Sequence, residues 1–113
     1  MAEKQPTGVL IVMSNNADPS RDVEFNDWYD HTHIPDVLAT GTYYSALRYT
    51  NEEAVEDEAR FVAVYHTDWK DPYAAYEEMK KQAGNFRPSP LFQRVSSAQY
   101  SLIGPPKSKR ASA

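Results

Sequence analysis

Four β-type segments and two helical segments follow one another in the order βαββαβ, and this order constrains the fold more than any other feature of the 113-residue chain. Short apolar runs, or β-branched and aromatic residues between turn signals, mark the β-type segments. We expect strands over residues 8–15, 42–50, 60–68 and 96–104, and helices over residues 20–36 and 71–84. Between them, residues 51–60 are acidic and predict a solvent-facing hairpin loop, whereas residues 87–95 are expected to be irregular.

Residues at the ends of both helical segments support these boundaries. Ser20 is expected to be the N-cap of the first helix. In the second, Asp71 is the expected cap, Pro72 suits the first turn and Gly84 suits the end. Pro35 lies inside the first helical pattern, and it predicts that this helix kinks or ends near His33.

The βαββαβ order predicts an α+β fold of the ferredoxin-like kind, with a four-stranded antiparallel sheet and both helices on one face. Residues 61–65, "FVAVY", are apolar on both sides of their strand. A sheet that is apolar on both faces but has helices for only one predicts a partner sheet, so we expect a homodimer. The domain is expected to span residues 1–103, and residues 104–113, "GPPKSKRASA", are expected to form a disordered tail.

Composition excludes several classes of function. The net charge of −4 argues against a nucleic-acid-binding protein, which needs clustered Lys and Arg. The chain has no cysteine, so disulfides, thiolate catalysis and cysteine-ligated zinc are excluded. No signal peptide and no apolar run of membrane-spanning length is visible, which predicts a cytoplasmic protein without a membrane partner.

The stretch from Phe25 to Gly41, "FNDWYDHTHIPDVLATG", carries a more specific signal. Its spacing Phe25-x-x-x-Tyr29-x-x-x-His33-x-Pro35 resembles the first helix of the EthD-like proteins of the dimeric α+β barrel superfamily. Ile34 stands where many members of that family have glycine. The resemblance implies a ferredoxin-like protomer, a dimer built around a β-barrel and a pocket between sheet and helices. The superfamily includes cofactor-free cyclases, isomerases, lyases and monooxygenases, so the reaction does not follow from the fold.

The residues themselves also indicate acid–base chemistry. At helical spacing, Tyr29 lies four residues before His33 and Asp36 lies three residues after it, so both can reach the imidazole. The Asp36 carboxylate would fix the tautomer of the imidazole, and the Tyr29 phenol would donate a hydrogen bond or a proton. We therefore predict His33, Asp36 and Tyr29 as the catalytic residues. The alternative is that His33 only caps backbone carbonyls at the end of the helix.

The other histidine of this helix does not suggest a metal site. His31 lies about 200° around the helix from His33, so it is expected to face solvent and cannot share a metal with His33. Asp27 and His31 alone provide too few ligands. We expect neither a metal nor a cofactor.

Five residues are predicted to bind substrate. Trp28 shares the helix face of Tyr29, and Arg48 is either one half of an ion pair or the anchor of a substrate anion. His66, at a strand end on the side of Val62 and Val64, either lines a pocket or is partly exposed. Two tyrosines, Tyr44 and Tyr100, are the remaining candidates.

Three classes of function stay open. The chain has neither a Gly-rich phosphate loop nor a nucleophile elbow, which leaves proton transfer on a small, aromatic or carbonyl-containing molecule. The first hypothesis is therefore a cofactor-independent lyase, isomerase or cyclase. The second is a non-catalytic module that binds a ligand or partner, and the third is a cofactor-free or haem-dependent monooxygenase. An enclosed cavity that reaches His33 would favour catalysis over the module.

Overall fold

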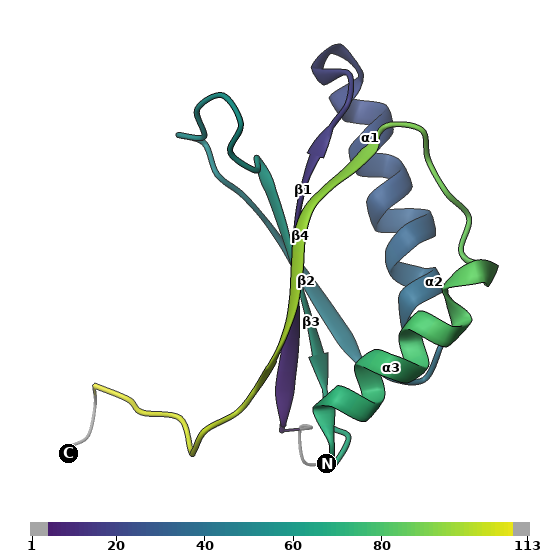
Figure 1. The fold of residues 1–113 in the computed structure, drawn as a ribbon. Helices are drawn as coiled ribbons and strands as arrows, with labels where there is room; N and C mark the ends of the chain where they lie inside the picture. Colours follow the sequence, from purple (N-terminus) through teal and green to yellow (C-terminus); the bar gives the residue numbers. More distant parts are fainter. Residues whose placement is uncertain (1–4, 110–113) are drawn as a thin grey trace.

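The computed structural model of the protein describes residues 5–109 and has the predicted order of elements. Its strands are β1 (Gly8–Asn16), β2 (Ser45–Thr50), β3 (Phe61–Thr67) and β4 (Phe92–Ser101). They form one antiparallel sheet in the order β2-β3-β1-β4. The main helices are α1 (Asp22–Trp28), α2 (Ile34–Leu38) and α3 (Pro72–Gln82), and all lie on the same face of the sheet (Figure 1). This is the ferredoxin-like α+β fold that the sequence predicts.

The first helix begins differently from the prediction. Ser20 does not cap α1; a 3₁₀ turn, η1 (Pro19–Arg21), precedes it, and Asp18 is the N-cap of that turn. The Asp18 carboxylate accepts hydrogen bonds from the Ser20 amide at 3.1 Å and from the Ser20 hydroxyl at 2.7 Å. Proline at the first position suits a turn that Asp18 caps, so the helical stretch starts two residues earlier than expected.

Pro35 does not end the first helical stretch. Instead, one π-helical turn, η2 (Tyr29–His33), separates α1 from α2. The Ile34 amide donates to the Tyr29 carbonyl, five residues back, which is the π-helical pattern. A proline ring clashes with the carbonyl four residues before it, here that of His31, and a wider turn moves that carbonyl away.

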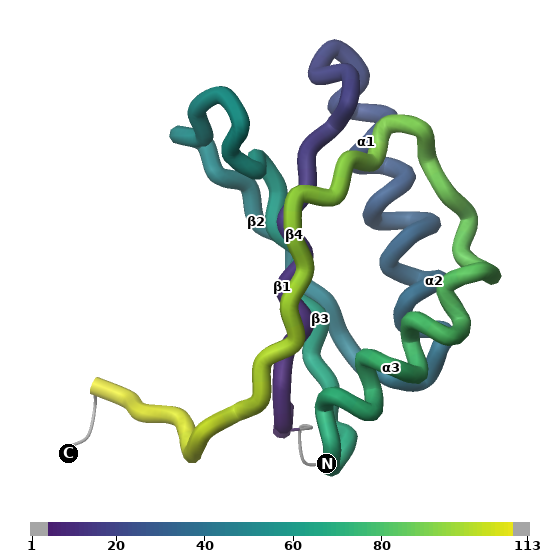
Figure 2. The backbone as a smooth tube through the Cα atoms, in the orientation of Figure 1, coloured from purple at the N-terminus to yellow at the C-terminus, as the bar shows by residue number. Residues whose placement is uncertain are grey.

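The second helix agrees with its prediction. The Asp71 carboxylate accepts from the amides of Tyr73 at 3.0 Å and Ala74 at 3.3 Å, and Pro72 is in the first turn. After Gln82 a 3₁₀ turn, η3 (Ala83–Asn85), leads into a loop that runs back along α2 and α1 before β4 begins (Figure 2). This loop, residues 86–91, closes the side of the helical layer.

Two strands have boundaries that local sequence did not predict. β2 begins at Ser45 rather than at residue 42, because Thr42 and Tyr43 turn into the core. β4 begins at Phe92, inside the stretch expected to be irregular, because its first residues pair with the end of β1. Long-range pairing therefore overrides a weak local signal in β4.

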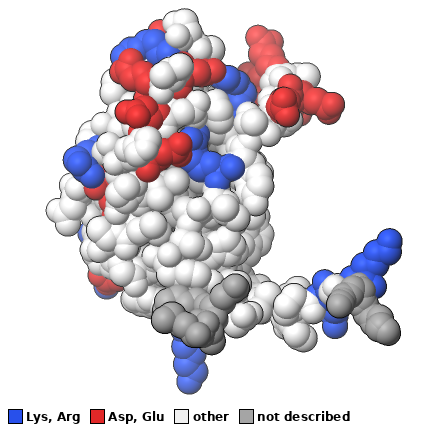
Figure 3. Space-filling view, turned by 180° about the vertical axis from the view of Figure 1, so that it is seen from behind, with Lys and Arg blue, Asp and Glu red and all other residues white. Residues whose placement is uncertain are grey.

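The other face of the sheet is apolar and open. Within residues 5–109 no helix covers it, and two segments project past its opposite ends (Figure 1). One is the loop of residues 51–60; the other is the C-terminal segment, residues 102–109. Acidic side chains gather on the loop and basic ones on the C-terminal segment (Figure 3). They are Glu52, Glu53, Glu56, Asp57 and Glu58 on the loop, and Lys107 and Lys109 on the segment.

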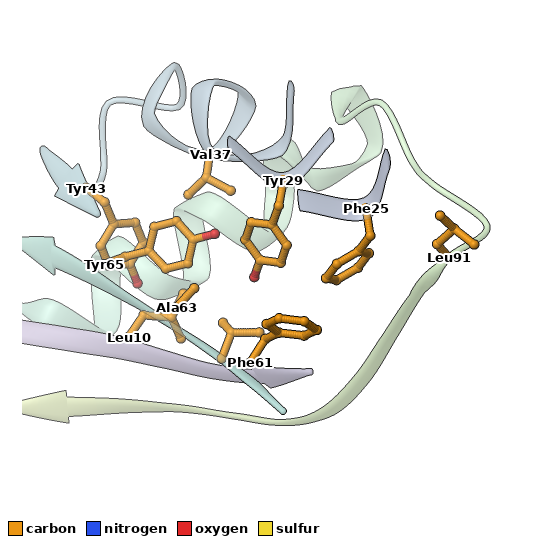
Figure 4. Close-up of a cluster of buried hydrophobic side chains, with 10 residues drawn as sticks. Leu10, Phe25, Tyr29, Val37, Tyr43, Phe61, Ala63, Tyr65 and Leu91 are labelled. Carbon is orange, nitrogen blue, oxygen red and sulfur yellow. The ribbon is translucent and has the colours of Figure 1, made fainter. Parts of the chain in front are cut away.

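The main core lies between the sheet and the helices. Phe25, Tyr29 and Val37 from the helical layer meet Tyr65 and Leu10 from the sheet, and all five are almost fully buried (Figure 4). Phe61 and Ala63 complete the sheet side, and Leu91 and Tyr43 enter from loops. The alternation of buried and partly buried residues along β1 and β3 directs one set of side chains into this core.

The predicted tail is only partly described. Residues 102–109 continue from β4 without helix or strand, the Leu102 amide bonds the Thr7 carbonyl at 2.7 Å, and Ile103 is fully exposed. Residues 110–113 of the predicted tail lie outside the described residues, so its disorder stays a prediction. No helix in residues 5–109 has the length and apolar character needed to cross a bilayer.

Gly8 is predicted to be sensitive to substitution. A Cβ at this position would lie against the Tyr100 carbonyl oxygen and 2.8 Å from Pro72 Cβ, so strand and helix would have to move apart. We expect Gly8→Ala to lower the free energy of unfolding by roughly 1–3 kcal/mol, measured by urea denaturation.

Gly84→Ala is the matched control. A Cβ at Gly84 meets no atom within 4 Å, and its φ lies outside the left-handed region. We expect it to be neutral or to stabilise the protein by about 0.4–1 kcal/mol. Equal effects of the two substitutions would contradict the close contact at Gly8.

Candidate functional site

A cavity of about 190 Å³ lies between the sheet, α3 and the π-helical turn. Most of its wall is apolar, and Leu10, Val12, Met79 and Phe86 are examples. The polar or charged residues that line it are His33, Tyr65, Tyr76, Lys80, Arg94 and Ser97. Among residues 5–109, no Asp or Glu lines it. We refer to this space as the inner cavity.

His33 occupies an aromatic cage on the wall of the inner cavity. Its ring stacks on the Trp28 ring with centroids 4.8 Å apart and an interplanar angle of 21°. The Tyr29 ring meets it edge-on at 5.0 Å, and Phe86 and Phe92 lie at 5.9 and 5.7 Å. The π-helical turn ends at His33 and so sets how its ring enters this cage.

The cage keeps the imidazole neutral. Burial lowers the pKa of His33 from 6.5 to about 4, Asp36 partly opposes this effect, and Arg48 adds to it. Nδ1 is buried and has no hydrogen-bond partner within residues 5–109. His33 therefore does not cap backbone carbonyls. The expected hydrogen bonds of its imidazole with Asp36 and Tyr29 are also not formed.

Asp36 has a different partner from the predicted one. Its carboxylate accepts from Arg87 Nη2 at 2.7 Å and from the Arg87 backbone amide at 2.8 Å. These hydrogen bonds lower the pKa of Asp36. Trp28 Nε1 donates to the Arg87 carbonyl at 3.0 Å. Asp36 and Trp28 thus hold the loop of residues 86–91 beside His33, and the expected pairing of Asp36 with the imidazole is not formed.

Two phenols lie deep in the same layer. The Tyr65 hydroxyl points toward Tyr29, and the Tyr29 hydroxyl points toward the sheet (Figure 4). Neither hydroxyl, nor that of Ser14, has a hydrogen-bond partner within residues 5–109. Burial raises the pKa of both phenols, and that of Tyr65 rises well above its ordinary value. Both therefore stay protonated and act as donors, but only Tyr65 lines the inner cavity.

Arg48 already binds residues of the first helical stretch. Its guanidinium donates to Asn26 Oδ1 at 2.8 Å and to Asp30 Oδ1 at 3.0 Å, and it lies 4.2 Å from the Tyr29 ring centroid. These contacts correspond to the ion-pair interpretation of Arg48. The side chain does not line the inner cavity.

The remaining predicted residues lie away from the inner cavity. His66 Nδ1 is 3.2 Å from Ser45 Oγ, and the Tyr44 ring lies 6.3 Å from that of His66. Tyr100 lines a more open hollow of about 640 Å³ beneath the C-terminal segment. That hollow is larger than the inner cavity, but among residues 5–109 Lys107 is the only charged residue in its wall, so these residues offer little for acid–base chemistry.

His31 faces solvent, as predicted. Its side chain is 74% exposed, and Nδ1 lies 3.1 Å from the Asp27 carboxylate. Within residues 5–109 no three His, Cys, Asp or Glu side chains are grouped so that they could hold a metal ion.

Sequence reasoning missed Tyr65, Arg94 and Ser97. Alternation along β3 places Tyr65 on the face of Phe61 and Ala63, and this signal was available. Arg94 and Ser97 are three residues apart and would lie on opposite faces of a regular strand. A register shift opposite Met13 and Ser14 inserts Val95 as an extra residue and brings both onto the helix-facing side. No local sequence signal predicts this bulge.

Two solved structures share the fold. The structure of HapK from Hahella chejuensis has a TM-score of 0.63 at 10% identity, over 91% of this chain and 99% of that one. A protein from Shewanella loihica PV-4, provisionally described as a monooxygenase, has a TM-score of 0.51 at 16% identity, over 89% of this chain and 99% of that one. At these identities the likeness concerns the fold alone.

The sequence itself matches one family model. No protein of curated function is similar enough in sequence to match. The EthD-like resemblance is not what the family comparison finds. The model for the domain of unknown function DUF4286 matches residues 9–93, which include all the helices and every residue that lines the inner cavity except Arg94 and Ser97. The chain belongs to the DUF4286 family.

Proposed function

We propose that the protein is a cofactor-independent enzyme that moves protons on a small molecule held in the inner cavity. The observation that carries this proposal is His33: a neutral imidazole with an unpartnered nitrogen, held in an aromatic cage on the cavity wall. A histidine whose side chain lines a largely apolar cavity is a candidate for contact with a ligand or a reacting proton.

His33 and Tyr65 have complementary roles in this proposal. The neutral imidazole accepts a proton from the carbon next to a substrate carbonyl, and the electron pair moves onto the carbonyl oxygen. In the structure the Tyr65 hydroxyl is buried and points toward Tyr29, so in this proposal the side chain shifts when substrate binds and then donates a hydrogen bond to that oxygen, which stabilises its negative charge. The imidazolium then gives the proton to another carbon of the conjugated enolate as the electron pair moves back, which is an isomerisation. Alternatively it protonates a leaving group as the electron pair forms a carbon–carbon double bond and the bond to that group breaks, which is an elimination. Both outcomes balance without a cofactor.

Several surrounding residues position this pair. The Tyr29 ring contacts the His33 ring edge-on. The ion pair between Arg87 and Asp36 holds the loop of residues 86–91 against the helix. The apolar wall excludes water and strengthens each polar contact inside the cavity. In this proposal Asp36 and Tyr29 support His33 through packing and loop anchoring, and the EthD-like resemblance of the helix is a distant kinship in a shared superfamily.

Two alternatives make different use of the cavity. A non-catalytic binding module would hold the ligand without turnover, and a cofactor-free monooxygenase would begin with the same proton removal by His33. The haem-dependent version is less compatible with the geometry. An apolar cavity of about 150 Å³ accommodates one benzene ring, so a cavity of about 190 Å³ does not accommodate a porphyrin macrocycle.

The open face of the sheet also supports a homodimer, which we propose as the working form. Val62 and Val64 of β3 lie on that face with Leu47 and Tyr49 of β2, and the last two are about half exposed. A two-fold partner would place the basic C-terminal segment of each copy near the acidic loop of the other (Figure 3). Charge complementarity and apolar area thus favour a second copy of the same chain on this face.

Catalysis by His33 can be tested once a substrate is found by thermal-shift screening of small carbonyl compounds and aromatic acids. We expect His33→Ala to lower kcat/KM by roughly 10²–10⁴-fold, and Tyr65→Phe to lower it by a smaller factor. His31→Ala should retain wild-type activity because that ring faces solvent. Equal activities of the two histidine variants would refute the assignment.

The neutral state of His33 predicts a specific pH dependence of stability. Its pKa is about 4 in the folded protein and about 6.5 when unfolded. Between these values the unfolded chain binds a proton that the folded protein does not, so stability falls as the pH falls from 6.5 to 4.

From pH 7.5 to 4.5, this loss should be about 2–3 kcal/mol larger in the wild type than in His33→Ala. Urea denaturation at both pH values measures the difference. His31→Ala is the control and should keep the wild-type pH dependence. An unchanged loss in His33→Ala would show that the imidazole is not held neutral by burial.

The dimer predicts a mass of roughly twice 12.9 kDa by light scattering at micromolar concentration. Leu47→Glu places a charge on the open face and should give monomers. Val23→Glu is the matched control, because Val23 is 87% exposed on the helical side and should leave the dimer intact. A wild-type monomer would refute the proposal.

A further inference from the structure

We propose that the inner cavity takes a small monocyclic carboxylic acid, whose carboxylate binds Arg94 at the mouth of the cavity. This inference rests on the proposed use of the cavity and specifies its ligand. It starts from size: about 190 Å³ is somewhat more than the roughly 150 Å³ that holds benzene. One six-membered ring with one or two substituents therefore fits.

The charges around the cavity are of one sign. Lys80 and Arg94 line it, and no carboxylate does. Lys80 is already paired with Glu77 at 3.0 Å and lies over the Tyr76 ring. The Arg94 guanidinium forms no ion pair and no side-chain hydrogen bond with residues 5–109, and it is exposed at the cavity mouth. A free guanidinium at the edge of an apolar cavity favours an anion with an apolar body.

The β-bulge directs Arg94 to this place. Without the extra residue Val95, Arg94 and Ser97 would point to opposite faces of β4. With it, both reach the inner cavity, and Ser97 Oγ lies 3.5 Å from the Tyr76 hydroxyl. The strand thus presents a cation and the Ser97 hydroxyl to the cavity, and Tyr76 of α3 adds a second hydroxyl group.

A carboxylate in the cavity would also change His33. Burial and the nearby Arg48 charge lower the pKa of its imidazole, and Asp36 is the acid that opposes them. A bound anion adds a second opposing charge and raises that pKa toward neutrality. The ligand would therefore make His33 a stronger base when it is in place.

Isothermal titration of the full chain with benzoate, phenylacetate and benzamide tests this inference. We expect the two acids to bind at least tenfold more tightly than the neutral amide. Arg94→Gln should weaken acid binding by about 10- to 100-fold and remove the preference over benzamide. Arg94→Lys should restore part of it, and Arg21→Gln, whose side chain pairs with Glu24 far from the cavity, should change nothing.

A second variant locates the binding site. Ala83 is exposed and lines the cavity, so Ala83→Trp should block the entrance and abolish binding of the acids without affecting the core. Binding that survives Ala83→Trp, benzamide that binds as tightly as benzoate, or acid binding that Arg94→Gln leaves unchanged would each overturn the proposal. Failure of both acids to bind at millimolar concentration would overturn it as well.

These outcomes separate the ligand from the reaction. Acid binding that depends on Arg94, with no turnover of any bound acid, would support the ligand class and refute the proposed catalysis. If instead a neutral compound is turned over, and this turnover is lost in His33→Ala but unchanged in Arg94→Gln, the ligand class would be refuted and the proposed catalysis supported.

Discussion

The π-helical turn at Tyr29–His33 is the constraint on which the candidate site depends. Pro35 cannot donate a backbone hydrogen bond and would clash with the His31 carbonyl in a regular helix. The wider turn resolves the clash and allows the helical stretch to continue through α2. It also ends at His33, whose ring enters the cage of Trp28 and Phe86. A backbone adjustment required by one proline therefore places a histidine with a buried Nδ1 on the cavity wall.

The cage has an electrostatic consequence. Aromatic walls stabilise the neutral imidazole by packing but offer it no hydrogen-bond acceptor, and burial disfavours its charged form. The Asp36 carboxylate, three residues after His33, is paired with Arg87 and acts on His33 only through space. Pairing with Arg87 instead secures the loop that forms one side of the cage. The site thus has a proton acceptor that is free at neutral pH and a phenol, Tyr65, that stays protonated.

The sequence predicts the fold well because its signals are local and repeated. Hydrophobic periodicity, the Asp71 cap and the position of Pro72 define the elements, and their order leaves few arrangements. The candidate site is predicted less completely. The helix motif identifies His33, but the partner of Asp36 lies 51 residues away and no spacing rule indicates it. Arg94 is not predicted because the β-bulge turns its side chain to the helix-facing side, whereas simple alternation along β4 would assign it to the open face. Elements therefore follow from neighbours along the chain, whereas the site depends on pairings between distant segments.

Strand β4 connects the two faces of the sheet. Its bulge sends Arg94 and Ser97 toward the inner cavity, while Ala98 and Tyr100, paired with Ile11 and Val9, belong to the open face. β4 is an edge strand, paired only with β1. Bulges are common on edge strands, where they redirect a side chain, as the bulge at Val95 does for Arg94. A partner copy packed on the open face would restrain β4 from behind, and this restraint would hold Arg94 at the cavity mouth. In the proposed dimer, ligand binding and dimer formation would therefore be coupled through β4, although they use opposite faces of the sheet.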